Sequence, residues 1–167
     1  MYFKISFLIF YISFLKYTFR NKKIVVFDID NTIANTWPSL LCKYKSEEDR
    51  LISLPVFDKV VEVAKSHIAT GEKIIFLTAR DYRQYFVTLK WLKNIGFSNV
   101  NLVMVSKPLE KIFLLSKIPQ KNILLYDDMS YNHEKGCVQF YEKEIYLISQ
   151  MKNIKHFDYN YLTKLND

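Results

Sequence analysis

The stretch KIVVFDIDNTIANT, residues 23–36, decides the fold. Its apolar run, residues 24–27, holds three β-branched residues and a phenylalanine, which is typical of a strand that is buried on both faces. The run ends at Asp28, and Asp30 follows two positions later. An extended backbone points both carboxylates the same way, and two like charges that lie close need a counter-charge, normally a divalent cation. The stretch therefore predicts a buried strand that leads into a site.

Three further stretches that are mainly apolar have the same strand-like character. They lie at residues 72–77, 101–105 and 122–126. Apolar residues at helical spacing occupy the stretches between the runs. We expect helices over residues 55–71, 82–95 and 108–118. Strands that alternate with helices predict a parallel α/β sheet, in which sites gather at the carboxyl ends of the strands. Thr78, Asp127 and Asp128 stand at such ends and are therefore expected near Asp28.

The residues Asp28-Ile29-Asp30-Asn31-Thr32 resemble the first motif of the haloacid dehalogenase (HAD) superfamily, which includes the aspartate-nucleophile phosphatases. Thr78, at the tip of the second strand, resembles the second motif. The third motif is a lysine near the start of the helix after the third strand. The acidic pair after the fourth strand resembles the fourth motif. The resemblance implies a Rossmann-like, HAD-type parallel sheet flanked by helices.

Members of the superfamily with these motifs hydrolyse phosphate monoesters with Mg²⁺, through an aspartyl-phosphate intermediate. By this resemblance Asp28 is the nucleophile and Asp30 is the acid/base. The metal would be held by Asp28, by Asp127 or Asp128, and by the backbone carbonyl of Asp30. The sequence does not decide which member of the acidic pair binds the metal directly.

The resemblance also implies residues that hold the transferring phosphoryl group. Thr78 would supply a hydroxyl, and Asn31 and Thr32 lie in the loop after the nucleophile. Two lysines compete for the third motif: Lys107, which precedes a proline, and Lys111, which begins a Lys-x-x-x-Leu pattern. The sequence does not decide between these two lysines.

No large cap domain is expected, because few residues separate Thr36 from the helix expected at residue 55. In the superfamily a cap usually determines which substrate is bound, so a chain without a large cap does not reveal its substrate by this resemblance. The apolar N-terminus favours a phosphorylated sugar, a glycan precursor or a lipid-linked phosphate. A nucleotide or polynucleotide-end phosphatase is one alternative, and a non-catalytic phosphoryl-binding or scaffold protein is another. Arg80 would hold substrate phosphate or stabilise the loop after the second strand.

The net charge of +7 is unevenly distributed along the chain. Five basic residues and no acid lie in residues 1–23, so the rest of the chain carries only +2, which is +7 less +5. A nearly neutral body argues against a nucleic-acid-binding surface, because binding the phosphate backbone needs a larger basic patch. A homo-oligomer is compatible with this composition.

Residues 1–22 form an apolar and basic segment ahead of the phosphatase domain expected over residues 23–167. A helix over its apolar run, residues 5–15, would rise only about 16 Å, roughly half of a bilayer core. The small-residue cleavage site of a signal peptide does not follow the run. One interpretation is a helix on a membrane surface, with its lysines near anionic lipid. The other is a segment packed on the domain or on a partner.

The chain after residue 128 is less informative. Residues 130–141 predict a hairpin, residues 144–148 another strand and residues 158–165 a short helix. Cys42 and Cys137 are too few for a zinc site or a disulfide framework, which is consistent with a reducing compartment. The expected location is the cytoplasm, peripheral to the membrane if residues 1–22 bind lipid.

Overall fold

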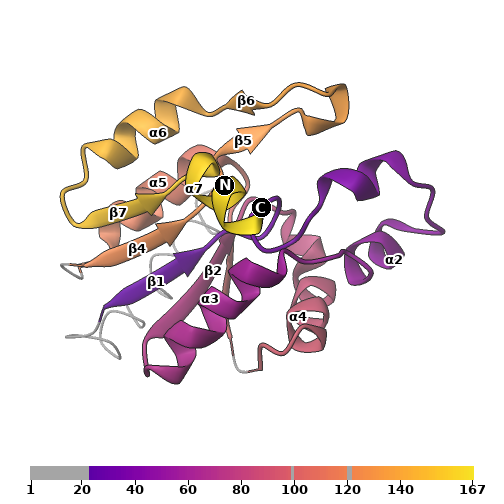
Figure 1. Ribbon diagram of the computed structural model, residues 1–167, viewed down its shortest axis with the longest axis horizontal. Helices are drawn as coiled ribbons and strands as arrows, with labels where there is room; N and C mark the ends of the chain where they lie inside the picture. Colours follow the sequence, from indigo (N-terminus) through magenta and orange to yellow (C-terminus); the bar gives the residue numbers. More distant parts are fainter. Residues whose placement is uncertain (1–22, 99, 120–121) are drawn as a thin grey trace.

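The computed structural model describes residues 23–98, 100–119 and 122–167. Five parallel strands form its main sheet in the order β3-β2-β1-β4-β7 (Figure 1). Their bounds are β1 Ile24–Phe27, β2 Lys73–Thr78, β3 Asn101–Met104, β4 Ile123–Tyr126 and β7 Ile154–Phe157. The predicted α/β sheet is therefore confirmed, with the strand of residues 24–27 at its centre.

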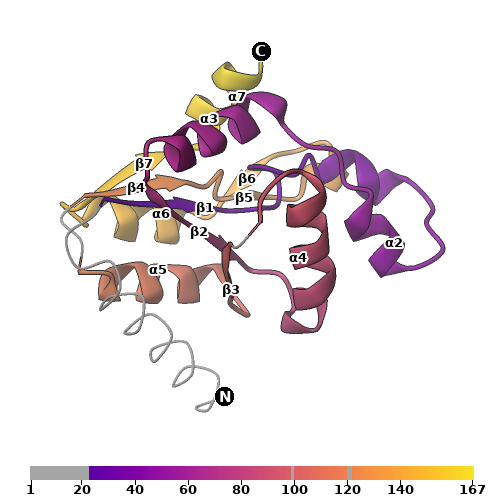
Figure 2. The ribbon, with the colours of Figure 1, turned by 90° about the horizontal axis from the view of Figure 1, so that it is seen from below.

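Helices cover both faces of the sheet, which explains why β1 is apolar throughout. Val25 and Phe27 point into one core, and Ile24 and Val26 point into the other. The first core is covered by α3 (Asp58–Ala69) and α7 (Tyr159–Asn166), the second by α5 (Pro108–Lys117) and α6 (Glu142–Ser149) (Figure 2). Helix α4 (Tyr85–Asn94), which follows the 3-10 helix η2 (Tyr82–Gln84), adds Trp91 to the first core.

A short excursion leaves the domain after β1 and returns before α3. It contains the 3-10 helix η1 (Trp37–Leu41) and helix α2 (Glu47–Ile52). Two backbone hydrogen bonds close its base: Asn35 N donates to Pro55 O over 2.9 Å, and Phe57 N donates to Ile33 O over 2.8 Å. Because Pro55 takes part in this closure, α3 begins at Asp58 and not at residue 55 as predicted. The excursion is far smaller than a cap domain, in agreement with the prediction.

The chain after β4 departs from the prediction at two elements. Strands β5 (Ser130–Tyr131) and β6 (Gln139–Phe140) form the predicted hairpin, with the 3-10 helix η3 (His133–Lys135) between them. Residues 144–148, predicted as a strand, belong to helix α6, where Ile145 and Ile148 lie one turn apart and pack into the second core. Strand β7, which was not predicted, follows this helix. Helix α7 lies where the last helix was predicted.

No helix within the described ranges is long and apolar enough to cross a membrane. The apolar segment of residues 1–22 lies outside those ranges. Its interpretation as a membrane-surface helix, and its boundary with the domain, therefore stay predictions.

Candidate active site

The predicted site residues gather at the carboxyl ends of the central strands. Phe27, the last residue of β1, lies opposite Tyr126, the last residue of β4, so Asp28 and Asp127 emerge side by side. Phe27 also lies opposite Phe76 of β2, which ends two residues later at Thr78. A pocket at this end of the sheet is lined by most of the predicted residues: Asp28, Asp30, Asn31, Thr78, Lys111, Asp127 and Asp128.

Three buried carboxylates form the floor of this pocket. Asp28, Asp127 and Asp128 each place one carboxylate oxygen so that the three oxygens lie within 4.8 Å of one another. The Lys111 Nζ lies 2.7 Å from Asp28 Oδ1 and donates a hydrogen bond to Asp127 Oδ2 over 2.9 Å. One ammonium group faces three carboxylates, so this cluster carries an excess of negative charge when the acids are ionised.

Burial and mutual repulsion make this charge costly. Burial raises the pKa of Asp28 well above its ordinary value, and the neighbouring carboxylates of Asp127 and Asp128 add to the effect. Burial likewise raises the pKa of Asp128. For Lys111, burial opposes the charged form, but the carboxylates of Asp127 and Asp28 outweigh it and raise the pKa of the ammonium group. The cluster therefore has the electrostatics of a cation site.

The donor set fits a divalent metal. Asp28 Oδ1 is buried, and the Lys111 ammonium group lies 2.7 Å from it. Carboxylate oxygens are the ligands that hard divalent cations such as Mg²⁺ prefer. A divalent cation held by these acids would supply the positive charge that Lys111 alone does not provide.

Asp30 lines the same pocket, and its carboxylate is held by Arg80 and Thr36. Arg80 grips its carboxylate with a fork: Nε to Oδ2 and Nη2 to Oδ1, both over 2.8 Å. Thr36 Oγ1 also donates to Asp30 Oδ1 over 2.8 Å. Burial opposes ionisation of Asp30, but Arg80 and Thr36 outweigh it and lower the pKa of the carboxyl. A contribution of Asp30 to the metal would therefore come from its backbone carbonyl, as the resemblance implies.

The contacts of Arg80 favour its stabilising role over direct binding of substrate. Its fork is committed to Asp30, its Nη1 donates to Thr88 Oγ1 over 3.3 Å, and its guanidinium carbon lies 5.7 Å from the centre of the Trp91 ring. The Arg80 backbone N–H donates to Thr78 Oγ1 over 3.3 Å, which fixes the threonine hydroxyl at the strand end. Arg80 thus connects the end of β2 to the acid after β1.

The other predicted residues occupy distinct positions. Lys107 is exposed at the N-cap of α5, whereas Lys111 is buried one turn later against the acids. Thr32 is fully buried, and its hydroxyl accepts a hydrogen bond from Asp128 N over 3.2 Å, so it ties the two acidic loops together. Asn31 has a left-handed backbone (φ 56°), as its place in a tight turn requires. Lys107 and Thr32 are not among the lining residues.

Three polar residues outside the predicted site residues support the acidic pair. Ser130 Oγ donates a short hydrogen bond to Asp128 Oδ2, and His133 Nε2 lies 2.9 Å from the same serine oxygen. His156 Nε2 lies 2.8 Å from Asp127 O. Ser130 and His133 stand within a few positions of Asp128, in the hairpin predicted over residues 130–141. His156 comes from β7, so only the fold brings it to the site.

One comparison with known proteins gives a match. The model of the family described as HAD superfamily, subfamily IIIB (acid phosphatase), matches residues 8–122. The matched span includes Asp28, Asp30, Thr78 and Lys111, and it ends before the acidic pair of β4. A search of curated proteins finds no match.

Proposed function

The chain belongs to the HAD superfamily and is a phosphoric monoester hydrolase, and from this premise we propose that it uses Mg²⁺ and an aspartyl-phosphate intermediate. The observation that carries the proposal is the buried carboxylate of Asp28, one oxygen of which lies within 4.8 Å of an oxygen of each of the buried acids Asp127 and Asp128, with the Lys111 ammonium group 2.7 Å from Asp28 Oδ1. The other two acids of the cluster and the Asp30 carbonyl would complete the metal site. Bound there, Mg²⁺ would offset the charge of the substrate phosphate.

In the first half of the proposed reaction an Asp28 oxygen attacks phosphorus. The new bond joins Asp28 to the phosphoryl group, and the bond from phosphorus to the leaving oxygen breaks. A proton from Asp30 goes to the leaving oxygen, which requires that its carboxyl be protonated in the substrate complex, against the lowered pKa that Arg80 and Thr36 give it in the free protein. In the second half Asp30 takes a proton from water, the water oxygen bonds to phosphorus, and the bond to Asp28 breaks. The products are an alcohol and inorganic phosphate, and Asp28 is regenerated.

Lys111 and Thr78 are the proposed partners of the phosphoryl oxygens. Both line the pocket, and Lys111 carries a buried positive charge within 2.7 Å of the proposed nucleophile. Fixed positive charge near the reacting group stabilises the transition state more in a buried site than in water. Asn31 lines the same pocket. The exposed position of Lys107 favours Lys111 in this role.

The substrate class stays a proposal. The absence of a large cap in the described part of the chain suits a substrate whose phosphate projects from a larger sugar, glycan precursor or lipid. A nucleotide or polynucleotide end is the second candidate, and the nearly neutral domain disfavours the polynucleotide. A screen of glycerol, sugar, lipid and nucleoside phosphates under one assay distinguishes these classes. A cytoplasmic location, membrane contact through residues 1–22 and self-association belong to the same set of proposals.

Metal dependence is the first test of the proposed function. We expect phosphate release from nitrophenyl phosphate to stop when the protein is dialysed against a chelator and to return when Mg²⁺ is added. Mg²⁺ should also raise the melting temperature, because a cation at about 100 times its Kd stabilises a folded protein by about 2.7 kcal/mol. Full activity and an unchanged melting temperature after exhaustive chelation would contradict the metal proposal.

Ser130 is expected to tune metal affinity through Asp128. The change Ser130→Ala removes the hydroxyl that orients Asp128 Oδ2 and leaves the carboxylate itself in place. Residues that orient metal ligands typically contribute about 10–100-fold in affinity, so the Mg²⁺ midpoint of the melting-temperature shift should rise by about that factor. Ser149→Ala is the control, since this exposed serine donates only to its own helix, at Tyr146 O. Equal Mg²⁺ midpoints for the two variants would rule the role out.

A further inference from the structure

The excursion between β1 and α3 is firmly anchored despite its small size. Backbone hydrogen bonds close its base at residues 33–35 and 55–57. Leu51 and Leu54 are almost fully buried in the first core. The indole N–H of Trp91 donates to Leu54 O over 3.0 Å, which fixes the excursion to α4. An element held in this way can place a side chain reproducibly.

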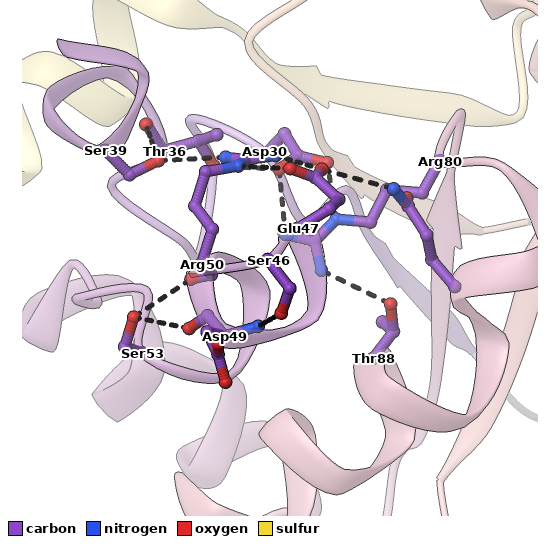
Figure 3. A network of polar contacts seen from close by, with 11 residues as sticks. Asp30, Thr36, Ser39, Ser46, Glu47, Asp49, Arg50, Ser53, Arg80 and Thr88 are labelled. Carbon is purple, nitrogen blue, oxygen red and sulfur yellow. Dashed lines mark hydrogen bonds and ion pairs between the residues drawn. The ribbon is translucent and has the colours of Figure 1, made fainter. Parts of the chain in front are cut away.

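Polar contacts run from this excursion to the proposed acid/base (Figure 3). Arg50 Nη1, on α2, donates to Ser39 Oγ over 2.9 Å. Ser39 Oγ donates in turn to Thr36 O over 2.7 Å. Thr36 Oγ1 then donates to Asp30 Oδ1 over 2.8 Å. Three successive hydrogen bonds therefore connect Arg50 to the Asp30 carboxylate.

Arg50 is itself held in place. Its Nε donates to Glu47 Oε2 over 2.8 Å and its Nη2 donates to Glu47 Oε1 over 2.5 Å. Glu47 Oε1 also accepts from Gln84 Nε2 over 3.2 Å, which connects α2 to the residue before α4. Only 15% of the Arg50 side chain is exposed. The two-pronged contact with the Glu47 carboxylate restricts the guanidinium.

Ser39 is the sensitive element of this chain of contacts. It is 98% buried, and its single hydroxyl both donates to Thr36 O and accepts from Arg50. A hydroxyl has one donor hydrogen, so its direction is set by the partners on either side. With Arg50 present, that hydrogen points to the backbone of Thr36. The backbone carbonyl of Thr36 thus accepts a hydrogen bond from Ser39, and the hydroxyl of Thr36 donates one to Asp30.

We infer that Arg50 is a positioning residue for Asp30, acting through Ser39 and Thr36. This inference rests on the acid/base role of Asp30 in the proposed function. Arg80 holds the Asp30 carboxylate from the β2 side, and the chain of contacts from Arg50 holds it from the excursion side. The excursion thereby completes the active site from outside the four sequence motifs. Displacement of a catalytic group by about 1 Å can reduce the rate by about 100-fold.

The test uses the leaving group of the substrate. An alkyl phosphate such as glycerol phosphate needs a proton from the acid as its oxygen departs, whereas nitrophenolate departs without one. For Arg50→Met we expect kcat/KM to fall about tenfold or more with glycerol phosphate and to stay within about threefold of wild type with nitrophenyl phosphate. Because kcat/KM reports the steps up to phosphoryl transfer, it isolates the step in which the leaving group departs.

Two further variants sharpen the result. Ser39→Ala breaks the same chain of contacts without touching the Arg50–Glu47 pair, so it should show the same dependence on leaving group. Arg83→Met is the control, because Arg83 pairs with Asp81 on the surface with 78% of its side chain exposed. It should leave both substrates unchanged.

The possible outcomes separate the inference from the proposed function. A wild-type protein inactive on both substrates with Mg²⁺ would count against the proposed function itself. An active wild type with equal losses on the two substrates for Arg50→Met would overturn the inference, and so would no loss on either. A rise in KM common to both substrates would assign Arg50 to substrate binding instead. A leaving-group dependence shared by Arg50→Met and Ser39→Ala, and absent from Arg83→Met, would establish Arg50 as a positioning residue for Asp30.

Discussion

Replacing Asp28 with asparagine is expected to lower the rate of phosphate release by about 10⁵-fold or more. The amide has nearly the same shape as the carboxylate, but it has no anionic oxygen to attack phosphorus. Asp28 is the buried acid closest to Lys111, and the other acids of the cluster stay in place to bind metal. The loss should therefore fall on kcat, measured with nitrophenyl phosphate and saturating Mg²⁺.

The same substitution should not weaken the fold. Burial raises the pKa of Asp28, so its contribution to stability is present at acid pH and is lost as the pH rises through that raised value. The ionised form of Asp28 therefore destabilises the metal-free protein, and a neutral asparagine removes this cost. We expect the melting temperature of metal-free Asp28→Asn to equal or exceed that of the wild type.

A control and a trapping experiment complete this prediction. Asp58→Asn changes an exposed acid at the start of α3 and should leave the rate unchanged. Acid quenching of wild-type protein turning over labelled substrate should leave phosphate bound to the chain, and the Asp28→Asn protein should retain none. A rate near that of the wild type in the variant would refute Asp28 as the nucleophile.

The sequence predicted those site residues that carry a carboxylate or a hydroxyl and stand at the end of a strand. Asp28, Thr78 and the acidic pair each stand at the end of an apolar run, and parallel pairing in register brings such ends together. Local patterns were sufficient there because one buried strand determines each position. The hairpin after β4 was predictable for a similar local reason, since polar turn residues surround it.

Contacts between residues that lie far apart in the sequence could not be predicted in the same way. The partners of Asp30 are Arg80, fifty positions away, and Thr36, and only the folded sheet brings the first of these within reach. Helix α6 was mistaken for a strand because its apolar residues are compatible with both periods over so short a segment. The choice between Lys107 and Lys111 depends on which face of α5 turns to the acids, and the burial of Lys111 reveals that face.

Replacing Lys111 with methionine is expected to affect both stability and activity. Its pKa is raised by the carboxylates of Asp127 and Asp28, so the stabilisation from its charge is fully present below the ordinary lysine pKa of about 10.4 and disappears only as the pH rises through the raised value. At neutral pH the variant therefore loses all of it. Removing one partner of a buried ion pair typically costs about 3–5 kcal/mol of unfolding free energy.

Lys107→Met is the matched control, because it makes the same chemical change at an exposed position, the N-cap of the same helix. Its unfolding free energy should change by less than about 0.5 kcal/mol, and its kcat/KM should stay near that of the wild type. For Lys111→Met we expect kcat/KM to fall by about 10²–10³-fold, the usual loss when one donor to the transition-state oxyanion is removed. Urea unfolding of both variants without metal, and again with Mg²⁺, separates the two effects: the cation should restore part of the stability of Lys111→Met, since it supplies positive charge to the same carboxylates, but not its rate. A larger loss of activity in Lys107→Met than in Lys111→Met would reassign the phosphate-site lysine.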